Sequence, residues 1–409
     1  MNKLNISTWI LLLSAAPMLA QPRFHAGGPA HDGEEITCYF PTREHLRNDV
    51  GKDDLGLCVF TSLEMAGIWC GNQSLLGLRD FMKNHPGGGW PEKVDRYLKI
   101  RDPQHTIRVL HHLDGDAEFL QRALAARQYV CVTYEGRDGI FYRSRVAHMV
   151  NLVHFSKRWA VIQDNNYPGK WLWMSPEDFL ARWRGINGGW AMILLQPGPP
   201  PALPQSTHVV CTITAPHPIM PLAAPVSGVI CGQPSRNDEY MLGGQAISRQ
   251  EVFERLEALQ VQQQRPSLTF LGSMQQQSAW HAVLQQPTFR TLQEQWCIRK
   301  FPQDSWLIRQ GFQPGVVLQN APDRQYRAAI RWHLASPAGG KSLQDQLEKE
   351  LHPRLPEPVE PEPDRVPERE DRFPQVLSQW GRKALHPSVA WTVLGYLLGN
   401  QFFVRRNRQ

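Results

Sequence analysis

Residues 53–70 read DDLGLCVFTSLEMAGIWC, an apolar run that begins just after a glycine and has a cysteine at its head. Four side chains in the run recur at helical spacing and share one face: Cys58, Ser62, Met65 and Trp69. Asp53 and Asp54 supply capping groups at the start, and Gly71 is typical of a helix end. The spacing therefore predicts a helix whose first turn carries Cys58.

Cys58 occupies the part of this predicted helix where a thiol ionises most easily. The unpaired N–H groups and the positive dipole end of a first turn favour the thiolate over the thiol. The other interpretation is a buried cysteine of the core, because cysteine is among the most buried residue types. Position alone leaves both interpretations open and favours the buried one.

A second stretch supplies groups that can activate a thiol. The runs AHMVNLVHF (147–155) and RWAVIQD (158–164) are typical of two strands of a hairpin. A three-residue loop places Val150 opposite Asp164, which makes His148 and Asp164 diagonal neighbours on one face. A two-residue loop reverses the parity and separates them. The pattern therefore allows a His–Asp pair without forcing it.

A cysteine that opens a helix, a histidine that starts a strand and an aspartate that ends the next strand together resemble the papain-like cysteine peptidases. The spacing from His148 to Asp164 is most similar to the bacteriocin-processing, C39-like branch, and the resemblance covers about residues 40–196. It implies an α+β papain-like domain over residues 21–196. It also implies that Cys58 is the nucleophile, His148 the general base and then acid, and Asp164 the group that orients the imidazole.

One position departs from the pattern of that family. The family places a glutamine about six residues before the cysteine, where it donates to the oxyanion, and this chain has Lys52 there. The nearest upstream amide is Asn48, in the stretch LRNDVG. We take Asn48 as the candidate oxyanion donor, together with the backbone N–H of Cys58.

Three further residues have two interpretations each. Trp90 follows HPGGG (85–89), and a glycine-rich loop that carries an aromatic ring either borders a substrate cleft or is a surface turn with its ring packed inward. Asn165 and Asn166 are typical turn residues before a proline, and they could instead hold Asp164 or line the cleft.

The histidines and cysteines give no metal-binding pattern. His111 and His112 have no acidic or cysteine partner at ligand spacing, so we predict no metal site, and no cofactor is predicted. None of the seven cysteines forms a CxxC pair, which argues against a zinc ribbon. Their odd number leaves at least one thiol without a disulfide partner inside the chain.

Residues 207–352 predict an α/β domain that resembles a thioredoxin-like fold. The predicted strands are 208–214, 267–272, 296–302, 315–319 and 326–332, and the predicted helices are 248–259, 278–286 and 342–351. Pro314 lies where that fold usually carries its cis-proline. The position of the redox CxxC reads MQQQ (274–277), and without a thiol pair there is no dithiol exchange. The resemblance therefore implies a redox-inactive module.

The remaining segments describe how the chain is organised. Residues 1–20 are typical of a cleaved signal peptide, so we expect an exported protein, periplasmic, cell-surface or secreted. Residues 197–206 predict a proline-rich linker that keeps the two domains apart, and 353–384 a proline-rich, charged spacer. Residues 385–409 are either a membrane anchor with a basic end or a packed terminal helix.

The sequence favours an exported cysteine hydrolase that cleaves a peptide or amide bond in a peptide or protein substrate. The net charge of +6 is dispersed, which argues against a nucleic-acid partner. Two alternatives stay open. One is a papain-like binding protein with weak or no catalysis, which the Lys52 departure supports. The other is a transglutaminase-like or deamidating acyl transferase, because an amine can take the same acyl group as water.

Overall fold

The computed structural model describes residues 24–103, 106–204, 239–335 and 339–352. The predicted signal peptide, the strand predicted at 208–214, the spacer and the C-terminal tail lie outside these residues. Within the described part of the chain, no helix is both long enough and apolar enough to cross a membrane.

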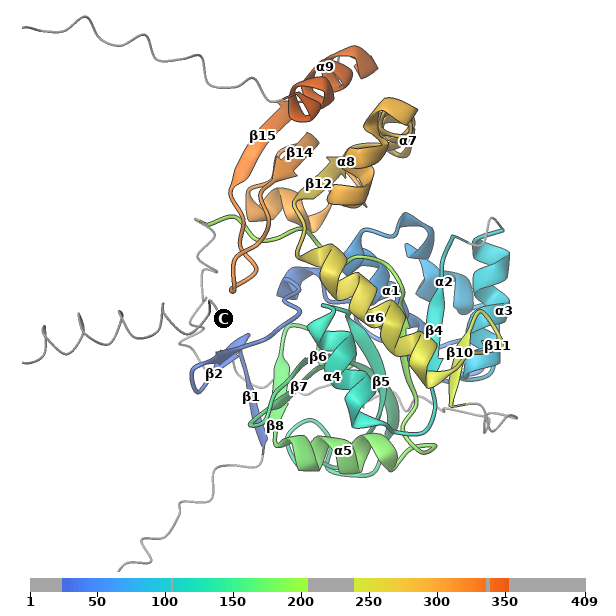
Figure 1. Cartoon of the computed structure of the whole chain (residues 1–409). Helices are drawn as coiled ribbons and strands as arrows, with labels where there is room; N and C mark the ends of the chain where they lie inside the picture. Colours follow the sequence, from blue (N-terminus) through green and yellow to red (C-terminus); the bar gives the residue numbers. More distant parts are fainter. Residues whose placement is uncertain (1–23, 104–105, 205–238, 336–338, 353–409) are drawn as a thin grey trace, which may run out of the picture. The chain divides into compact units, whose positions relative to one another are not determined.

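Nine strands of the described residues form one sheet, in the order β1-β8-β7-β6-β5-β9-β4-β10-β11 (Figure 1). Paired neighbours in it are antiparallel. The strands are β1 Phe24–Gly27, β4 Val109–His112, β5 Val130–Glu135, β6 Ala147–Phe155, β7 Ala160–Gln163, β8 Trp171–Met174, β9 Ala191–Leu194, β10 Tyr240–Leu242 and β11 Gln245–Ala246. Strand β6, an inner strand of this sheet, is buried from His148 to His154, so the polar side chains it carries are also buried.

Helix α1, Cys58–Cys70, packs against β5 and β6. Every residue of α1 except Ile68 is buried, so burial extends well beyond the face that carries Cys58, Ser62, Met65 and Trp69. The other helices of this part are α2 Leu78–Met82, α3 Pro91–Arg101, α4 Ala117–Ala125, α5 Pro176–Arg184 and α6 Arg249–Gln263. Both α4 and α5 contact β5. A small hairpin, β2 Ala30–His31 and β3 Glu34–Glu35, also belongs to this first part of the chain.

The β6–β7 hairpin reaches the predicted register by an unpredicted route. Its loop has four residues, 156–159, because Phe155 lies opposite Ala160. A bulge between Leu152 and His154 then shifts the pairing by one residue, so that Asn151 lies opposite Gln163. Continued by one step, this register puts Val150 level with residue 164. The longer loop and the bulge therefore cancel on the side of the hairpin where His148 lies.

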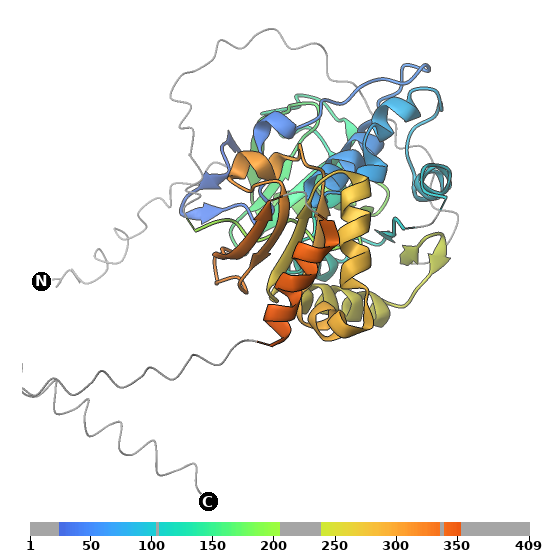
Figure 2. The ribbon, with the colours of Figure 1, turned by 90° about the horizontal axis from the view of Figure 1, so that it is seen from above.

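A four-stranded sheet in the described residues forms the second part, in the order β13-β12-β14-β15. Its strands are β12 Ser267–Leu271, β13 Cys297–Phe301, β14 Gly315–Gln319 and β15 Ile330–Ala335. Strand β13 runs parallel to β12, whereas β14 is antiparallel to both β12 and β15. Its helices are α7 Met274–Leu284, α8 Arg290–Gln295 and α9 Gly339–Leu351, and α7 and α9 lie side by side (Figure 2).

Two predicted boundaries of this part are wrong for local reasons. The helix predicted from residue 278 starts at Met274, because Ser273 and Gln276 form a capping box there. The strand predicted from Tyr326 starts at Ile330, because Tyr326 has a φ of +57° and turns the chain.

The prediction that residues 197–206 keep the two domains apart is also wrong. Because proline has no backbone N–H, a proline-rich run makes few backbone hydrogen bonds. Buried side chains of the second sheet donate to its carbonyl groups instead. Arg299 Nε donates to Gly198 O at 2.8 Å, and Gln319 Nε2 donates to Pro201 O at 2.9 Å. The linker is therefore a packed connection over its first residues.

The predicted domain boundary at residue 207 is likewise contradicted. Strand β10 pairs with β4 and extends the first sheet. Helix α6 contacts α4, and Val252 and Leu256 belong to the first hydrophobic core. Residues 240–263 thus belong with the first sheet rather than with the second.

Candidate active site

Cys58 is the first residue of α1 and is 1% exposed. The N-cap is Leu57, which offers no side-chain hydrogen bond, so the predicted capping by the upstream aspartates is wrong. Asp53 instead accepts hydrogen bonds from the backbone N–H groups of Leu55 and Gly87. The first turn of α1 therefore has neither a side-chain cap nor an acidic residue.

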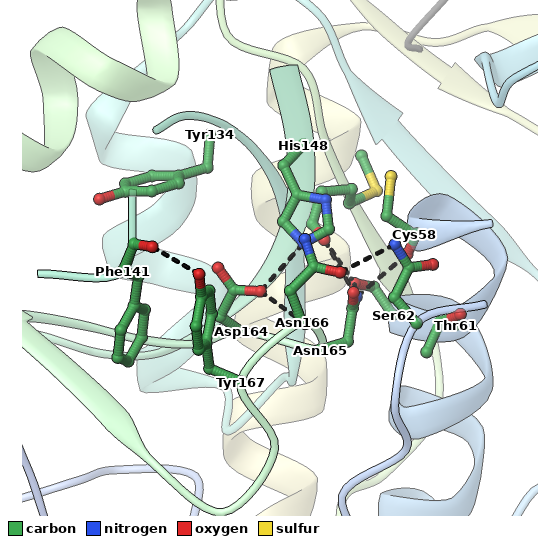
Figure 3. Close-up of polar contacts among 12 residues, drawn as sticks. Cys58, Thr61, Ser62, Tyr134, Phe141, His148, Asp164, Asn165, Asn166 and Tyr167 are labelled. Carbon is green, nitrogen blue, oxygen red and sulfur yellow. Dashed lines mark hydrogen bonds and ion pairs between the residues drawn. The ribbon is translucent and has the colours of Figure 1, made fainter. Parts of the chain in front are cut away.

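Hydrogen bonds between side chain and backbone fix the start of α1 against β6. Ser62 Oγ donates to Met149 O at 3.1 Å, and Asn151 Nδ2 donates to Ser62 O at 3.1 Å. Asn165 Nδ2 lies within 3.3 Å of Cys58 O, 2.9 Å of Ser62 Oγ and 3.1 Å of Met149 O (Figure 3). Because Met149 follows His148 in the chain, these bonds set the position of the thiol relative to the imidazole.

His148 lies between Cys58 and Asp164. Its Nε2 is 3.0 Å from Asp164 Oδ1, and both side chains are fully buried. Its Nδ1 makes no hydrogen bond of ordinary geometry with another described residue, and Figure 3 shows that side of the ring turned toward Cys58. The Nε2–H therefore donates to the carboxylate, and Nδ1 is left to exchange a proton with the sulfur.

The environment of His148 favours the imidazolium. Burial lowers the pKa of His148, but the carboxylate of Asp164 and the sulfur of Cys58 outweigh burial and raise that pKa to about 10. The charge of Asp164 therefore stabilises the protonated ring of His148.

Asp164 is held by two further donors. Tyr142 Oη donates to Asp164 Oδ2 at 2.7 Å, and the backbone N–H of Asn166 donates to Oδ1 at 2.8 Å. Burial, followed by the charge of Asp164, raises the pKa of Tyr142 well above its ordinary value, so the phenol stays a neutral donor. Both carboxylate oxygens are therefore fixed, and so is the plane of the His148 ring.

Sequence reasoning missed Tyr142 and the residue that positions it. Asp138 Oδ1 accepts from the backbone N–H groups of Ile140, Phe141 and Tyr142, and Oδ2 accepts from Tyr134 Oη. The pattern Asp-x-x-x-Tyr in 138–142, with a glycine inside it, is a turn signal that could have marked this loop. Nothing local in it indicates that the tyrosine reaches Asp164.

Asn48 belongs to the same polar network. Its Nδ2 donates to Asn166 Oδ1 at 3.0 Å, and Asn166 Nδ2 donates to Tyr142 Oη at 3.0 Å. Its neighbour Asp49 accepts from the backbone N–H of Leu57 at 2.9 Å, which places the Asn48 segment beside the start of α1. Lys52, six residues before Cys58, is exposed. The asparagines 165 and 166 thus serve the site rather than only a turn.

The glycine-rich loop before Trp90 lies against the helix of Cys58. A Cβ added to Gly89 would lie 2.5 Å from the Cβ of Val59, the residue after Cys58. Lys93 Nζ holds the loop by donating to the carbonyls of His85 and Pro86, and it lies 5.2 Å from the centre of the half-buried Trp90 ring. The structure therefore brings the loop of Trp90 next to helix α1.

The sequence shows no acidic or cysteine partner at ligand spacing for His111 and His112, but the fold places a carboxylate beside each of them. His111 Nε2 lies 3.2 Å from Asp95 Oδ1, and His112 Nε2 lies 2.8 Å from Asp114 Oδ1. Burial lowers the pKa of His112 to about 4. In the part of the chain that the structure describes, no three His, Cys, Asp or Glu residues group in a way that suits a metal ion.

Four other described cysteines are buried and free of disulfides, as Cys58 is: Cys38, Cys70, Cys131 and Cys297. Burial raises the pKa of Cys38 and of Cys70 to about 12. These thiols are core groups in the neutral form.

No protein-family model matches this chain, and a search of curated proteins found no significant match.

Proposed function

We propose that the protein is an exported cysteine hydrolase that cleaves a peptide or amide bond through Cys58, His148 and Asp164. The observation that carries the proposal is the position of His148, with one ring nitrogen on a fixed carboxylate and the other turned toward the only described cysteine at a helix start. The papain-like, C39-like fold remains part of this proposal. It is supported by an α1 that packs against an antiparallel sheet carrying the histidine and aspartate.

The reaction follows from this arrangement. The Cys58 thiolate attacks the carbonyl carbon, which forms the C–S bond and puts the negative charge on the carbonyl oxygen. The His148 imidazolium gives its Nδ1 proton to the leaving amine as the C–N bond breaks. Water then attacks the thioester, His148 takes the water proton, and the C–S bond breaks to release the acid and the thiol.

Two groups are assigned to the oxyanion in this proposal. The Cys58 backbone N–H is at a helix start and points away from any internal carbonyl partner. Asn48 supplies the second donor, since its segment lies beside Leu57 and its amide is within the Asp164 network. The Asn48 amide keeps a second N–H besides the one that Asn166 accepts.

The second sheet serves as a binding or spacing module in this proposal. Its strand order, with β12 and β13 parallel and the other pairs antiparallel, supports the thioredoxin-like assignment. Where that fold carries its thiols, Gln277 Nε2 instead donates to the carbonyls of Gly272 and Phe301. The first turn of α7 is thus used for packing rather than for redox chemistry.

The test is mass spectrometry of the purified chain after incubation with a peptide-based electrophile. We expect one adduct on Cys58 and its loss in His148→Ala. His111→Ala is the matched control, because His111 is an equally buried histidine on a carboxylate that lies away from Cys58. An adduct that forms as fast in His148→Ala, or none on Cys58, refutes the proposal and favours the binding-protein alternative.

A second measurement separates hydrolysis from acyl transfer. A protein substrate that the wild type processes is incubated with and without glycine methyl ester. Release of the free acid alone supports hydrolysis, whereas incorporation of the ester amine in excess over the acid identifies an acyl transferase.

A further inference from the structure

A pocket of about 400 Å³ lies outside the Cys58 site, between helix α3, strand β4 and the β10–β11 hairpin. These elements lie on the same side of the molecule in Figure 1. The hairpin turns at Gly243 and Gly244, with φ of +59° and +85°, a two-residue turn that only glycine adopts without strain. Residues 242, 243 and 245 of this hairpin form one wall of the pocket.

Asp95 brings a carboxylate oxygen without a donor to this pocket. It is 6% exposed, and its Oδ1 lies 3.2 Å from His111 Nε2. Trp190 Nε1 donates to His111 Nδ1 at 3.3 Å, so it is the hydrogen on Nε2 that Asp95 Oδ1 accepts. Asp95 Oδ2 is inaccessible to solvent and has no hydrogen-bond partner among the described residues.

A buried carboxylate oxygen without a donor is costly, and proteins normally pair it with a cation or a hydrogen-bond donor. His111 supplies one hydrogen bond, to Oδ1, and leaves Oδ2 without a donor. The second carboxylate of the pocket, Asp102, is already used, because its Oδ2 accepts from Thr106 Oγ1 and from the backbone N–H of Ile107. Asp95 is therefore the group to which a ligand cation would bind.

The same pocket also carries positive charge. Lys99 and Arg108 line it, and neither side chain makes a hydrogen bond or ion pair with another described residue. The remaining wall is apolar and includes Leu98, Val109 and Leu242. The pocket thus offers a buried acceptor for an ammonium group, two cations for a carboxylate and an apolar surface between them.

We infer that this pocket binds a small zwitterion with an apolar side chain, a free amino acid or a dipeptide. The charge of the Asp95 carboxylate, which lines the pocket, attracts the ammonium group, the ligand's carboxylate lies between Lys99 and Arg108, and its side chain contacts the apolar wall. The inference is independent of the peptidase proposal, since it uses no residue of the Cys58 site. A metal ion fits less well, because His111 Nε2 already faces Asp95 and no further ligand group of the described residues joins them.

The test is calorimetric titration of the full chain with L-leucine and with leucyl-leucine. We expect saturable binding of one or both. N-acetyl-leucine, which lacks the ammonium group, and leucinamide, which lacks the carboxylate, should each bind at least tenfold more weakly than leucine. Asp95→Asn should weaken binding at least tenfold, because the amide still accepts from His111 but carries no charge.

Controls separate the site from the fold and from the catalytic proposal. Glu257→Gln, an exposed acid on α6, and Cys58→Ala should bind leucine as the wild type does. The double variant Lys99→Gln, Arg108→Gln should bind leucine more weakly than the wild type. Because it changes only exposed side chains, we expect it to stay folded. If neither leucine nor leucyl-leucine binds, a water molecule satisfies Asp95 and the inference is wrong. If either binds equally to wild type and Asp95→Asn, the inference is also wrong.

Discussion

Two histidines of the same sheet each lie fully buried on an aspartate, yet only one has the surroundings of a catalytic base. His148 on β6 lies 3.0 Å from Asp164, and His111 on β4 lies 3.2 Å from Asp95. The indole N–H of Trp190 occupies the other nitrogen of His111. The other nitrogen of His148 is turned toward Cys58. A buried His–Asp pair is therefore common to both sites, and what the second nitrogen faces distinguishes them.

The largest effect is expected from exchanging the two histidines for alanine. His148→Ala removes the proton carrier, and we expect hydrolysis or probe labelling of Cys58 to fall by about 10²–10⁴. His111→Ala leaves the thiol and its base in place, so the labelling rate should stay within about threefold. It should lower the free energy of unfolding by about 1–3 kcal/mol, because Asp95 and Trp190 lose their partner. Labelling kinetics and urea unfolding of both variants check this. If both variants lose labelling to the same extent, the claim that only His148 acts on Cys58 is wrong.

A smaller effect is expected at the oxyanion. Asn48→Ala should lower turnover by about 10²-fold if its amide donates to the oxyanion, as removal of one such donor does elsewhere. Alkylation of Cys58 by a small reagent should change little, because that reaction develops no oxyanion. Comparing the two rates in one variant separates the oxyanion role from a structural one. If both rates fall together, Asn48 acts by holding Asn166 instead.

Tyr142→Phe is expected to have a moderate effect. It removes the donor to Asp164 Oδ2 and leaves that buried oxygen without a partner, so turnover should fall about tenfold. The matched control is Tyr134→Phe, which removes a tyrosine hydroxyl bound to Asp138 instead. If Tyr134→Phe lowers turnover more than Tyr142→Phe, the loop at 138–142 matters for its shape and not for the Asp164 contact.

The pH dependence of stability should differ in sign between two buried histidines. The folded pKa of His148, about 10, lies above its ordinary 6.5, so its stabilising effect is complete below about pH 6.5 and is lost as pH rises toward 10. The folded pKa of His112, about 4, lies below 6.5, so its contribution is present above that pH and is lost as pH falls toward 4. Urea unfolding of His148→Gln and His112→Gln against wild type at pH 5, 7 and 9 checks this. The same sign for both would contradict it.

The sequence predicted the elements whose signals are local. The helix at Cys58, the hairpin that carries His148 and Asp164, and most strands of the second sheet were predicted because spacing and capping residues lie within a few positions of each other. The hairpin register was right on the site side only because an extra loop residue and a bulge near Leu152 cancel. Neither of these two features has a sequence signal.

The contacts that sequence reasoning missed join distant positions. Tyr142 reaches Asp164, Asp95 reaches His111, and the carbonyls of Gly198 and Pro201 accept from side chains of the second sheet. A proline-rich run was interpreted as a spacer because its composition is that of an extended chain. Its packing depends on partners about a hundred residues away, which composition does not show.

The rate at which iodoacetamide alkylates Cys58 at neutral pH tests the account most directly. Peptide mass spectrometry follows the modification of Cys58 and of Cys131 over time in the wild type, in His148→Ala and in His111→Ala. Although both thiols are buried, we expect Cys58 to react far faster than Cys131, to slow at least tenfold in His148→Ala, and to keep its rate in His111→Ala. A Cys58 that reacts no faster than Cys131, or equally fast in wild type and His148→Ala, would contradict the claim that His148 activates it.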